Sequence, residues 1–235
     1  MKDLFGKALL DYYYGNYTED IITETSISEE DVLPLSYLFR DYNQMPKIEQ
    51  KALDCAIGSV LDVGAGAGSH ALYLQNTRLL DVTAIDISKG AIEVCKLRGI
   101  TKTKLSDLKD FSEGTFDTIL ILMNGSGIFG RLKNVPALLL HLKSLLNKNG
   151  KIFVDSSDII YMFDDDPDGG KWVPGHRYYG ELEFKLSYKN ETEAAFSWLY
   201  IDFNTLKNVA NSCGLQCELI IEGEHYDYLA CLFIE

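Results

Sequence analysis

From residue 59 to residue 155 short apolar runs alternate with amphipathic stretches, and this alternation constrains the fold more than any other feature of the chain. The amphipathic stretches carry their apolar residues at helical spacing, and the apolar runs read as buried strands. The predicted strands lie at residues 60–63, 81–85, 102–105, 116–123 and 151–155. Strands and helices that alternate at this pace predict βαβ units, and therefore a mostly parallel sheet covered by helices on both faces.

The flanking regions follow a different pattern. Residues 1–58 read as a helical extension, in which Ser26 and Glu29 have the spacing of a capping box and Pro46 opens a helix that stops at Gly58. The segment after residue 155 contains a predicted hairpin and then a helix and two strands. These elements are expected at residues 181–188 with 194–200, at 204–212, and at 216–222 and 228–234.

Composition excludes several classes of protein. A chain of 235 residues that is 46% hydrophobic can build one sizeable core, so we expect a single domain. Its formal net charge of -13 argues against nucleic acid as a partner, because phosphate binding depends on Lys and Arg. The charged start and the lack of an apolar run of about 20 residues predict a cytoplasmic protein without a membrane partner.

The metal-ligand patterns in the chain are incomplete. The five cysteines are scattered, and Cys213 and Cys217 are one residue too far apart for a C-x-x-C pair. The acidic run at residues 164–169 resembles a calcium loop, but Gly175 stands where the bidentate glutamate should be. We therefore expect no metal site.

Three glycines follow the first predicted strand at alternate positions. Gly64, Gly66 and Gly68 lie where a strand must turn into a helix, and a backbone without Cβ atoms there can bring N–H groups close to a ligand. Asp86 comes 18 residues after Gly68, at the end of the second strand, where a carboxylate can accept hydrogen bonds from both ribose hydroxyls. This arrangement predicts a nucleoside-containing ligand.

Two cofactor classes fit such a turn. A nicotinamide or flavin dinucleotide calls for G-x-G-x-x-G, but Ser69 occupies the position of the third glycine. Asp62, just before the first glycine, suits a ligand with an ammonium group better than one with a pyrophosphate. The turn therefore favours a cationic cofactor, and an NAD-type oxidoreductase remains the enzymatic alternative.

These motifs, in this order, resemble the class I S-adenosylmethionine-dependent methyltransferases. Residues 61–68 are similar to the family's first motif and residues 84–88 to its second. The resemblance implies a seven-stranded, mostly parallel, doubly wound sheet with an antiparallel last strand, and S-adenosylmethionine as the cofactor. The cofactor-binding residues that it implies are Asp62, Gly64, Ala65, Gly66, Gly68, Asp86, Ile87, Ser106, Asp107, Leu108, Met123, Asn124 and Gly125. It divides the domain into a helical cap (1–58), a cofactor-binding core (59–155), a substrate-side insert (156–203) and a C-terminal helix with a strand pair (204–235).

Methyl transfer from a sulfonium needs positioning more than a dedicated catalytic group. If the acceptor must lose a proton, His176 in the insert and Asp155 beyond the fifth strand are the candidate bases. We expect the acceptor to be an oxygen or nitrogen atom of a small molecule or of an accessible side chain. A regulatory or scaffold protein that binds the cofactor without turnover is the non-enzymatic alternative, and the oligomeric state stays open.

Two segments outside the strand–helix alternation are rich in aromatic residues, and we expect them to form a lid over the acceptor. The N-terminal segment offers tyrosine faces and an arginine that could pair with a carboxylate, and the insert could form the opposite wall. The candidate substrate and lid residues are Tyr14, Tyr37, Arg40, Asp158, Trp172 and Arg177. We expect residues 8–45 and 158–198 to close over the cleft when cofactor binds.

Overall fold

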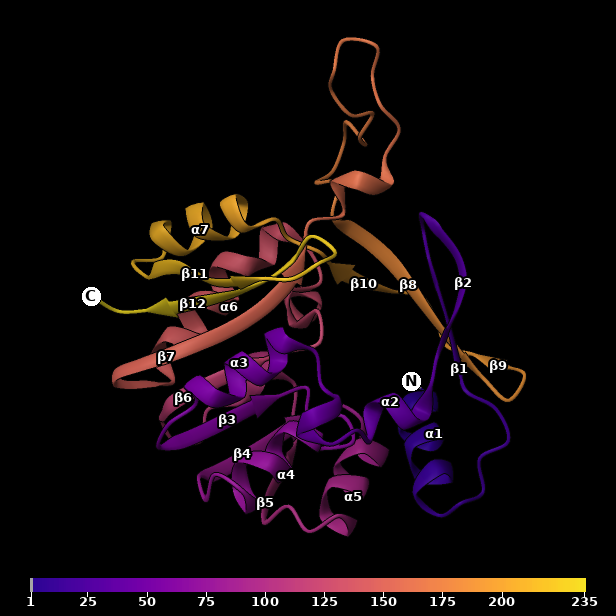
Figure 1. Ribbon diagram of the computed structural model, residues 1–235, viewed down its shortest axis with the longest axis vertical. Helices are drawn as coiled ribbons and strands as arrows, with labels where there is room; N and C mark the ends of the chain where they lie inside the picture. The colour runs from indigo at the N-terminus through magenta and orange to yellow at the C-terminus, as the bar shows by residue number, and fades with distance from the viewer. Residues whose placement is uncertain (1) are drawn as a thin grey trace.

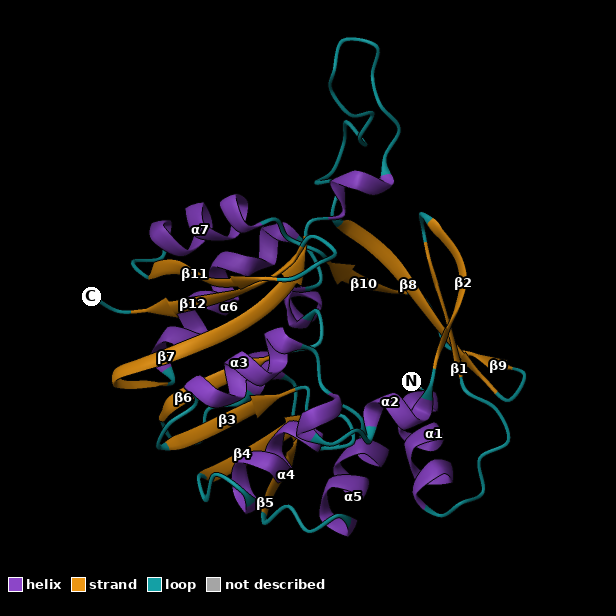
Figure 2. Cartoon of the chain, viewed as in Figure 1, coloured by secondary structure: helices purple, strands orange, loops and turns teal. Residues whose placement is uncertain are grey.

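The computed structural model describes residues 2–235 and contains two separate β-sheets (Figures 1 and 2). The larger sheet has seven strands in the order β11-β12-β7-β6-β3-β4-β5. Its strands are β3 (Ser59–Val63), β4 (Asp81–Asp86), β5 (Lys102–Leu105), β6 (Phe116–Ile121), β7 (Leu146–Ser157), β11 (Gln216–Glu222) and β12 (Asp227–Phe233). The central strands β3, β4, β5, β6 and β7 pair in parallel, and β12 is antiparallel to β7. The predicted sheet, including its antiparallel last strand, is confirmed.

Helices cover both faces of this sheet. The helices of the molecule are α1 (Leu4–Tyr13), α2 (Leu35–Leu38), α3 (Lys47–Cys55), α4 (Ser69–Asn76), α5 (Lys89–Leu97), α6 (Val135–Ser144) and α7 (Phe203–Ser212). Neighbouring strand residues point to opposite faces: Leu61 packs in a core cluster with α6 and α7, and Val60 in a cluster with α3 and α4. The strand order reverses between β3 and β6, and open α/β sheets bind ligands outside the carboxyl ends of such strands.

The second sheet joins two parts of the chain that are far apart in sequence. Its order is β10-β8-β1-β2, with β9 paired to β8. The strands are β1 (Ile21–Thr25), β2 (Ser28–Leu33), β8 (Glu181–Tyr188), β9 (Glu191–Thr192) and β10 (Phe196–Leu199). Strand β1 pairs with β8 in antiparallel register, so that Ile22 lies opposite Ser187. The N-terminal segment and the insert therefore form one structural unit.

The N-terminal extension is not helical throughout. The prediction of a helix that begins at Ser26 is wrong. Ser26 lies in the turn between β1 and β2, where its backbone N–H donates to the Glu183 carbonyl at 2.9 Å. Pairing with β8 overrides the local capping signal. The helix expected after Pro46 is present as α3.

Short 3-10 helices connect the main elements. They are η1 (Tyr42–Gln44), η2 (Leu108–Asp110), η3 (Gly125–Phe129), η4 (Leu132–Asn134) and η5 (Ile159–Met162). Between η5 and β8, residues 163–177 project from the body as an extended arm (Figure 1). Among residues 2–235 no helix has both the length and the apolar character that a bilayer crossing requires.

Candidate active site

The glycine turn, residues 64–68, connects β3 to α4. Gly64, Gly66 and Gly68 all have positive φ, at 72°, 55° and 81°, a region that side chains with a Cβ rarely adopt. Gly68 also has no room for a side chain, since a Cβ built there would lie 2.3 Å from Cδ1 of Ile100. Backbone conformation therefore favours glycine at all three positions, and packing against Ile100 and Cys95 adds a second restriction at Gly68.

Helix α5 supports the outer side of the glycine turn. The Cys95 thiol donates to the Gly66 carbonyl at 3.4 Å, and the Arg98 guanidinium donates to the Ala67 carbonyl at 2.6 Å. These contacts hold two carbonyl groups away from the edge of the sheet. The turn is thus fixed before any ligand arrives.

Asp86 ends β4 directly beside this turn. Its carboxylate accepts hydrogen bonds from the backbone N–H of Gly66 at 2.9 Å and of Ser88 at 2.8 Å. Burial raises the pKa of Asp86, although both N–H donors lower it. The next residue, Ile87, is an apolar side chain that is 72% exposed. A carboxylate next to an open apolar surface suits a ribose with an attached base.

Asp62 lies under the turn with part of its carboxylate unused. The side chain is buried, and its Oδ2 atom has no hydrogen-bond partner among residues 2–235. Burial raises the pKa of Asp62, against the lowering effects of His70 and the Ala71 N–H. A buried carboxylate oxygen without a donor is costly, so this atom suits a cationic group of a ligand.

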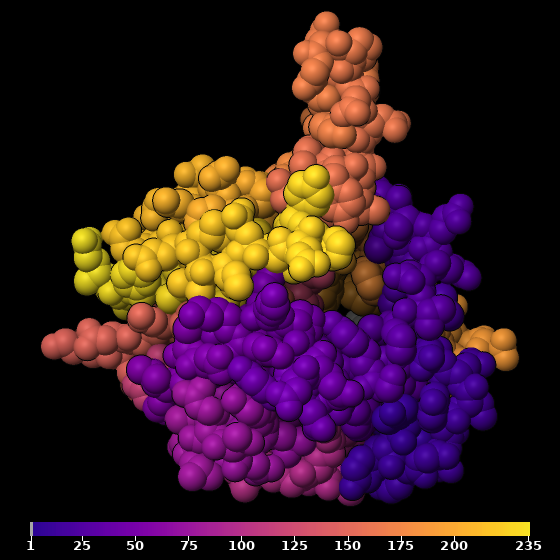
Figure 3. Space-filling model, in the orientation of Figure 1, coloured from indigo at the N-terminus to yellow at the C-terminus, as the bar shows by residue number. Residues whose placement is uncertain are grey.

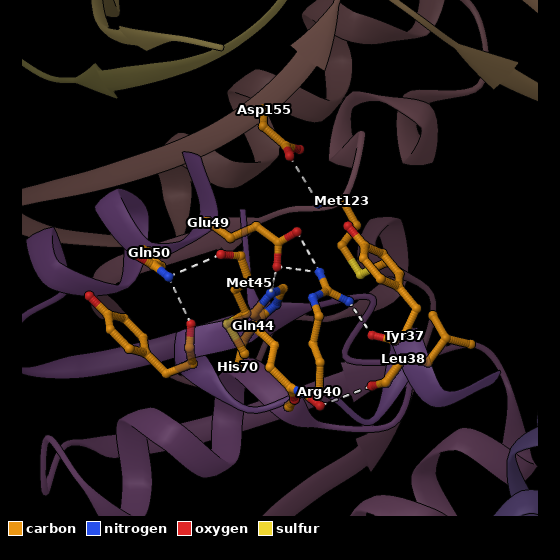
Figure 4. Close-up of polar contacts among 12 residues, drawn as sticks. Tyr37, Leu38, Arg40, Gln44, Met45, Glu49, Gln50, His70, Met123 and Asp155 are labelled. Carbon is orange, nitrogen blue, oxygen red and sulfur yellow. Dashed lines mark hydrogen bonds and ion pairs between the residues drawn. The ribbon is translucent and has the colours of Figure 1, made fainter. Parts of the chain in front are cut away.

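A buried charge cluster, formed by Arg40, Glu49 and His70, borders the same edge (Figure 4). Glu49 on α3 pairs with the Arg40 guanidinium, and its Oε2 lies 2.7 Å from Nε2 of His70. Burial opposes ionisation of Glu49, but the hydrogen bonds and charges of His70 and Arg40 lower its pKa overall. For His70, burial is outweighed by Glu49 and Asp62, and the pKa is raised. Glu49 is therefore paired with the Arg40 guanidinium and hydrogen-bonded to His70, and this contact favours the protonated form of His70.

Asp155 on β7 faces this cluster from across the edge (Figure 4). It accepts hydrogen bonds from the backbone N–H of Met123 at 3.0 Å and of Gly125 at 2.8 Å. Met123 and Asn124 both have positive φ, so Asp155 stabilises a strained turn after β6. Burial raises the pKa of Asp155 to about 7, with a further contribution from Glu49. No cationic side chain of the described chain pairs with it.

The comparisons with known proteins agree with this geometry. A family model described as a methyltransferase domain matches residues 35–191. A solved S-adenosylmethionine-dependent methyltransferase from Bacteroides fragilis, in complex with S-adenosylhomocysteine, is 46% identical, with a TM-score of 0.91 over 99% of this chain and 95% of that one. This chain belongs to the S-adenosylmethionine-dependent methyltransferases.

Two more distant structures share the fold. A sugar N-methyltransferase from Streptoalloteichus is 15% identical, with a TM-score of 0.60 over 90% of this chain and 97% of that one. An amino pentose methyltransferase from Micromonospora echinaspora is 13% identical, with a TM-score of 0.59 over 87% of this chain and 98% of that one. No curated protein sequence matches this methyltransferase.

The residues at the edge of the sheet fit S-adenosylmethionine. The unpartnered Oδ2 of Asp62 and the unpartnered Nε of Arg40 are an acceptor and a donor, which match the ammonium and carboxylate of a methionine group. Asp86 and the exposed Ile87 match the ribose and adenine. The cofactor supplies an activated methyl group on a sulfonium, and the chain supplies its binding and orientation.

The other motif residues of the methyltransferase lie at the same edge. Ser106, Asp107 and Leu108 follow β5, and the Asp107 side chain accepts a hydrogen bond from the Lys109 N–H at 3.1 Å at the start of η2. Asn124 follows β6, and its Oδ1 accepts a hydrogen bond from the Ser157 hydroxyl at 2.9 Å. The strand ends named by the sequence motifs are thus brought together.

The candidate lid residues are distributed unevenly. Tyr37 lies at the site, with its ring 3.8 Å from the Arg40 guanidinium carbon. Asp158 accepts a hydrogen bond from the Tyr179 hydroxyl at 2.7 Å, at the base of the arm. Tyr14 is 57% exposed and caps the C-terminal end of α1.

The arm carries the remaining candidates. Trp172 is 65% exposed, and His176, the sequence-based candidate for a base, is also exposed. Neither side chain forms a hydrogen bond within the described chain. Arg177 is half-buried, and its Nε has no partner among residues 2–235. Of the two candidate bases, Asp155 is the one at the edge of the sheet that carries Asp62, Asp86 and the glycine turn.

An aromatic wall is formed by Phe184, Phe196 and Trp198 of the second sheet, and Phe196 packs in a cluster with Ala67 and Met123 at the edge of the larger sheet. Phe196 lies opposite Phe184 in the register of β10 and β8, and all three rings are partly buried. Trp198 packs directly on Gly127, where a Cβ would lie 1.8 Å from the indole. Figure 3 shows a hollow between the N-terminal segment, α3 and the β11–β12 turn.

Sequence reasoning missed Glu49, although a signal was present. Glu49, Ala52, Leu53 and Ala56 have the spacing i, i+3, i+4, i+7, which places the acid on the buried stripe of α3. An acid on such a stripe must have partners. The partners come from Arg40 and from His70 on α4, and their proximity depends on the tertiary fold.

Proposed function

We propose that this methyltransferase transfers the methyl group of S-adenosylmethionine to an amine nitrogen of a small molecule, and that Asp155 takes the proton that the amine must lose. The acceptor would bind between the carboxyl edge of the seven-stranded sheet and the aromatic wall. The N-terminal segment and the insert, joined as the second sheet, would enclose it.

The observation that carries this proposal is the charge balance of four buried carboxylates, Glu49, Asp62, Asp86 and Asp155. Glu49 pairs with Arg40 and is hydrogen-bonded to His70. Asp62 lies near the charge of His70 but keeps an unpartnered Oδ2, and Asp86 and Asp155 accept hydrogen bonds from backbone N–H groups only. The cofactor brings one α-ammonium group, which suits Asp62. The ribose hydroxyls would be donors to Asp86. Asp155, once ionised, has no cationic partner in the described chain, and a protonated amine acceptor would supply one.

The proposed reaction balances in protons and electrons between the acceptor, Asp155 and the cofactor. An ammonium acceptor transfers one proton to the Asp155 carboxylate and thereby exposes a nitrogen lone pair. That lone pair forms the new N–C bond while the C–S bond breaks and its electron pair stays on sulfur, which yields S-adenosylhomocysteine and a methylated ammonium product. A base with a pKa near the working pH serves this step best, and the pKa of Asp155 is about 7.

The aromatic wall supports the same acceptor class. Aromatic faces attract cations and exclude water, so Phe184, Phe196 and Trp198 suit an alkylammonium group with an apolar body. Tyr37, which is 38% exposed, offers a further ring beside Arg40.

The test is methyl incorporation from labelled S-adenosylmethionine into matched pairs of amines and their hydroxyl analogues. We expect methylated amines, with kcat/KM rising with pH until Asp155 is ionised and levelling above about 7. In Asp155→Asn we expect kcat/KM to fall by about 10²–10⁴-fold and this pH dependence to disappear. Methylation of the hydroxyl analogues alone would contradict the proposal.

A control separates chemistry from folding. The Asn amide would face the N–H of Met123 or Gly125, so S-adenosylhomocysteine affinity and melting temperature are measured in the same variant. Glu183→Gln removes an exposed carboxylate that pairs with Arg131, away from the buried edge. This control should keep wild-type turnover. An equal loss in both variants would assign the effect to general charge and not to Asp155.

A further inference from the structure

Helix α1 begins directly beside the ribose-side carboxylate of the cofactor site. Asp3, the N-cap of α1, accepts hydrogen bonds from the Gly6 N–H and from the Gly90 N–H of α5, both at 2.9 Å. Asp3 is also close enough to raise the pKa of Asp86. One carboxylate thus fixes the starts of two helices next to the ribose-binding residue.

The two helices approach each other closely at a pair of glycines. A Cβ built on Gly90 would lie 2.5 Å from the backbone of Gly6, and a Cβ on Gly6 would meet Asp3 and Ser88 at 2.5 Å. At Gly90 the conflict is with backbone, so glycine is required there; at Gly6 a Cβ would displace the Asp3 and Ser88 side chains. The start of α1 is therefore held against α5 in one position.

This placement puts Phe5 over the glycine turn. A Cβ built on Gly66 would lie 3.8 Å from Cζ of the Phe5 ring, and the Gly66 N–H is the donor to Asp86. Phe5 is only partly buried, although its neighbours Leu4 and Gly6 are buried. An aromatic ring with uncovered surface therefore stands beside the groups that fit the ribose.

The other side of α1 is tied to the second sheet. The Leu4 N–H donates to Glu193 at 2.5 Å, and Asp11 accepts hydrogen bonds from Tyr188 at 3.1 Å and Lys189 at 2.8 Å. Figure 1 shows α1 between α5 and the second sheet. The helix therefore links the cofactor edge to the sheet that carries the aromatic wall.

We propose that Phe5 is a cofactor-contacting residue and that the start of α1 closes the ribose end of the S-adenosylmethionine site. Phe5 packs its exposed ring surface against the bound nucleoside, while Asp3 and the Gly6–Gly90 contact set the position of the ring. The proposal concerns cofactor binding only and does not depend on the identity of the acceptor.

Calorimetry with S-adenosylhomocysteine tests this assignment. Phe5→Ala should weaken binding about 5- to 10-fold, since part of the hydrophobic contribution of one phenylalanine is lost. Phe5→Leu keeps an apolar side chain and should lose less. Tyr13→Phe removes a hydrogen bond from α1 to the Leu97 carbonyl without touching Gly66, and it should bind as the wild type does.

A second readout keeps the test valid if Phe5→Ala folds poorly. In protein carrying 4-fluorophenylalanine at position 5, the fluorine resonance should shift in proportion to occupancy as S-adenosylhomocysteine is added. Unchanged affinity in Phe5→Leu together with an unmoved fluorine resonance would overturn the assignment. Failure of the amine proposal would leave both of these results unaffected.

Discussion

The two sheets of this methyltransferase differ in how their strands come together. In the seven-stranded sheet, β3, β4 and β5 are neighbours in sequence and in space, and each is followed by a turn at the carboxyl edge. In the second sheet, β1 pairs with β8 across more than half of the chain. The difference teaches that local patterns specify the cofactor edge, whereas long-range pairing builds the opposite wall.

The two sheets also differ in chemistry. Carboxylates with raised pKa, Asp62, Asp86 and Asp155, gather at the edge of the seven-stranded sheet. The inner face of the second sheet presents aromatic rings, and its outer face carries exposed ion pairs such as Lys185 with Glu24. Changes on the two sheets should therefore have separable effects.

The largest expected effect is on the pH dependence of stability. The pKa of Asp155 is raised to about 7 in the fold, so folded chains bind more protons than unfolded ones between about pH 4 and 7. Stability contributed by the protonated group is present at low pH and is lost as pH rises through about 7, by a few kcal/mol. The free energy of unfolding, measured with urea at several pH values, should fall less steeply with pH in Asp155→Asn than in the wild type. Glu183→Gln should show the wild-type pH dependence. The same pH dependence of unfolding free energy in both variants would contradict the view that titrating carboxylates are concentrated at the edge of the seven-stranded sheet.

The next effect concerns the ribose-side carboxylate. Asp86→Ala should weaken S-adenosylhomocysteine binding by about 1.5–3 kcal/mol, the range for hydrogen bonds to a charged group. Asp31→Asn, on the exposed strand β2, should leave affinity unchanged. Titration calorimetry compares the two. Wild-type affinity in a folded Asp86→Ala variant would show that this carboxylate does not hold the cofactor.

A smaller effect is expected where the two sheets meet. Gly127→Ala places a methyl group in the volume of the Trp198 indole, and overpacking of this kind costs about 1–3 kcal/mol. Amide exchange should quicken in β8 and β10, while cofactor affinity stays close to wild type. Faster exchange confined to β3 and β4 would show that the contact supports the other sheet.

The smallest effect concerns the exposed ion pairs of α1. Lys7→Gln removes a contact of 3.3 Å with Glu191, and exposed pairs of this kind contribute little because solvent screens them. Denaturant midpoints of wild type and variant should nearly coincide. A loss as large as that in Gly127→Ala would mean that charge, and not packing, holds the second sheet to the body.

The sequence was sufficient for the elements whose signals are local. The glycine turn and Asp86 follow buried strands directly, and the helix expected after Pro46 is present as α3. The sequence was insufficient for Ser26, because hydrogen bonding to Glu183 of β8 places it in a turn between strands and not at a helix N-terminus. It was also insufficient for Glu49, because the partners of Glu49 lie on other elements. His176 is favoured as a base because it is a histidine in the predicted insert, but its exposure in the arm depends on the tertiary fold.

The most direct test of the central claim is hydrogen exchange with and without S-adenosylhomocysteine, followed by addition of an amine acceptor. The account predicts that cofactor alone protects residues 62–70, the start of α5 and the start of α1, with a smaller gain in the lid segments 8–45 and 158–198. Addition of the amine should then give β8 and β10 their largest gain in protection. Protection that appears first in β8 and β10, with residues 62–70 unchanged, would contradict the division of cofactor and acceptor between the two sheets.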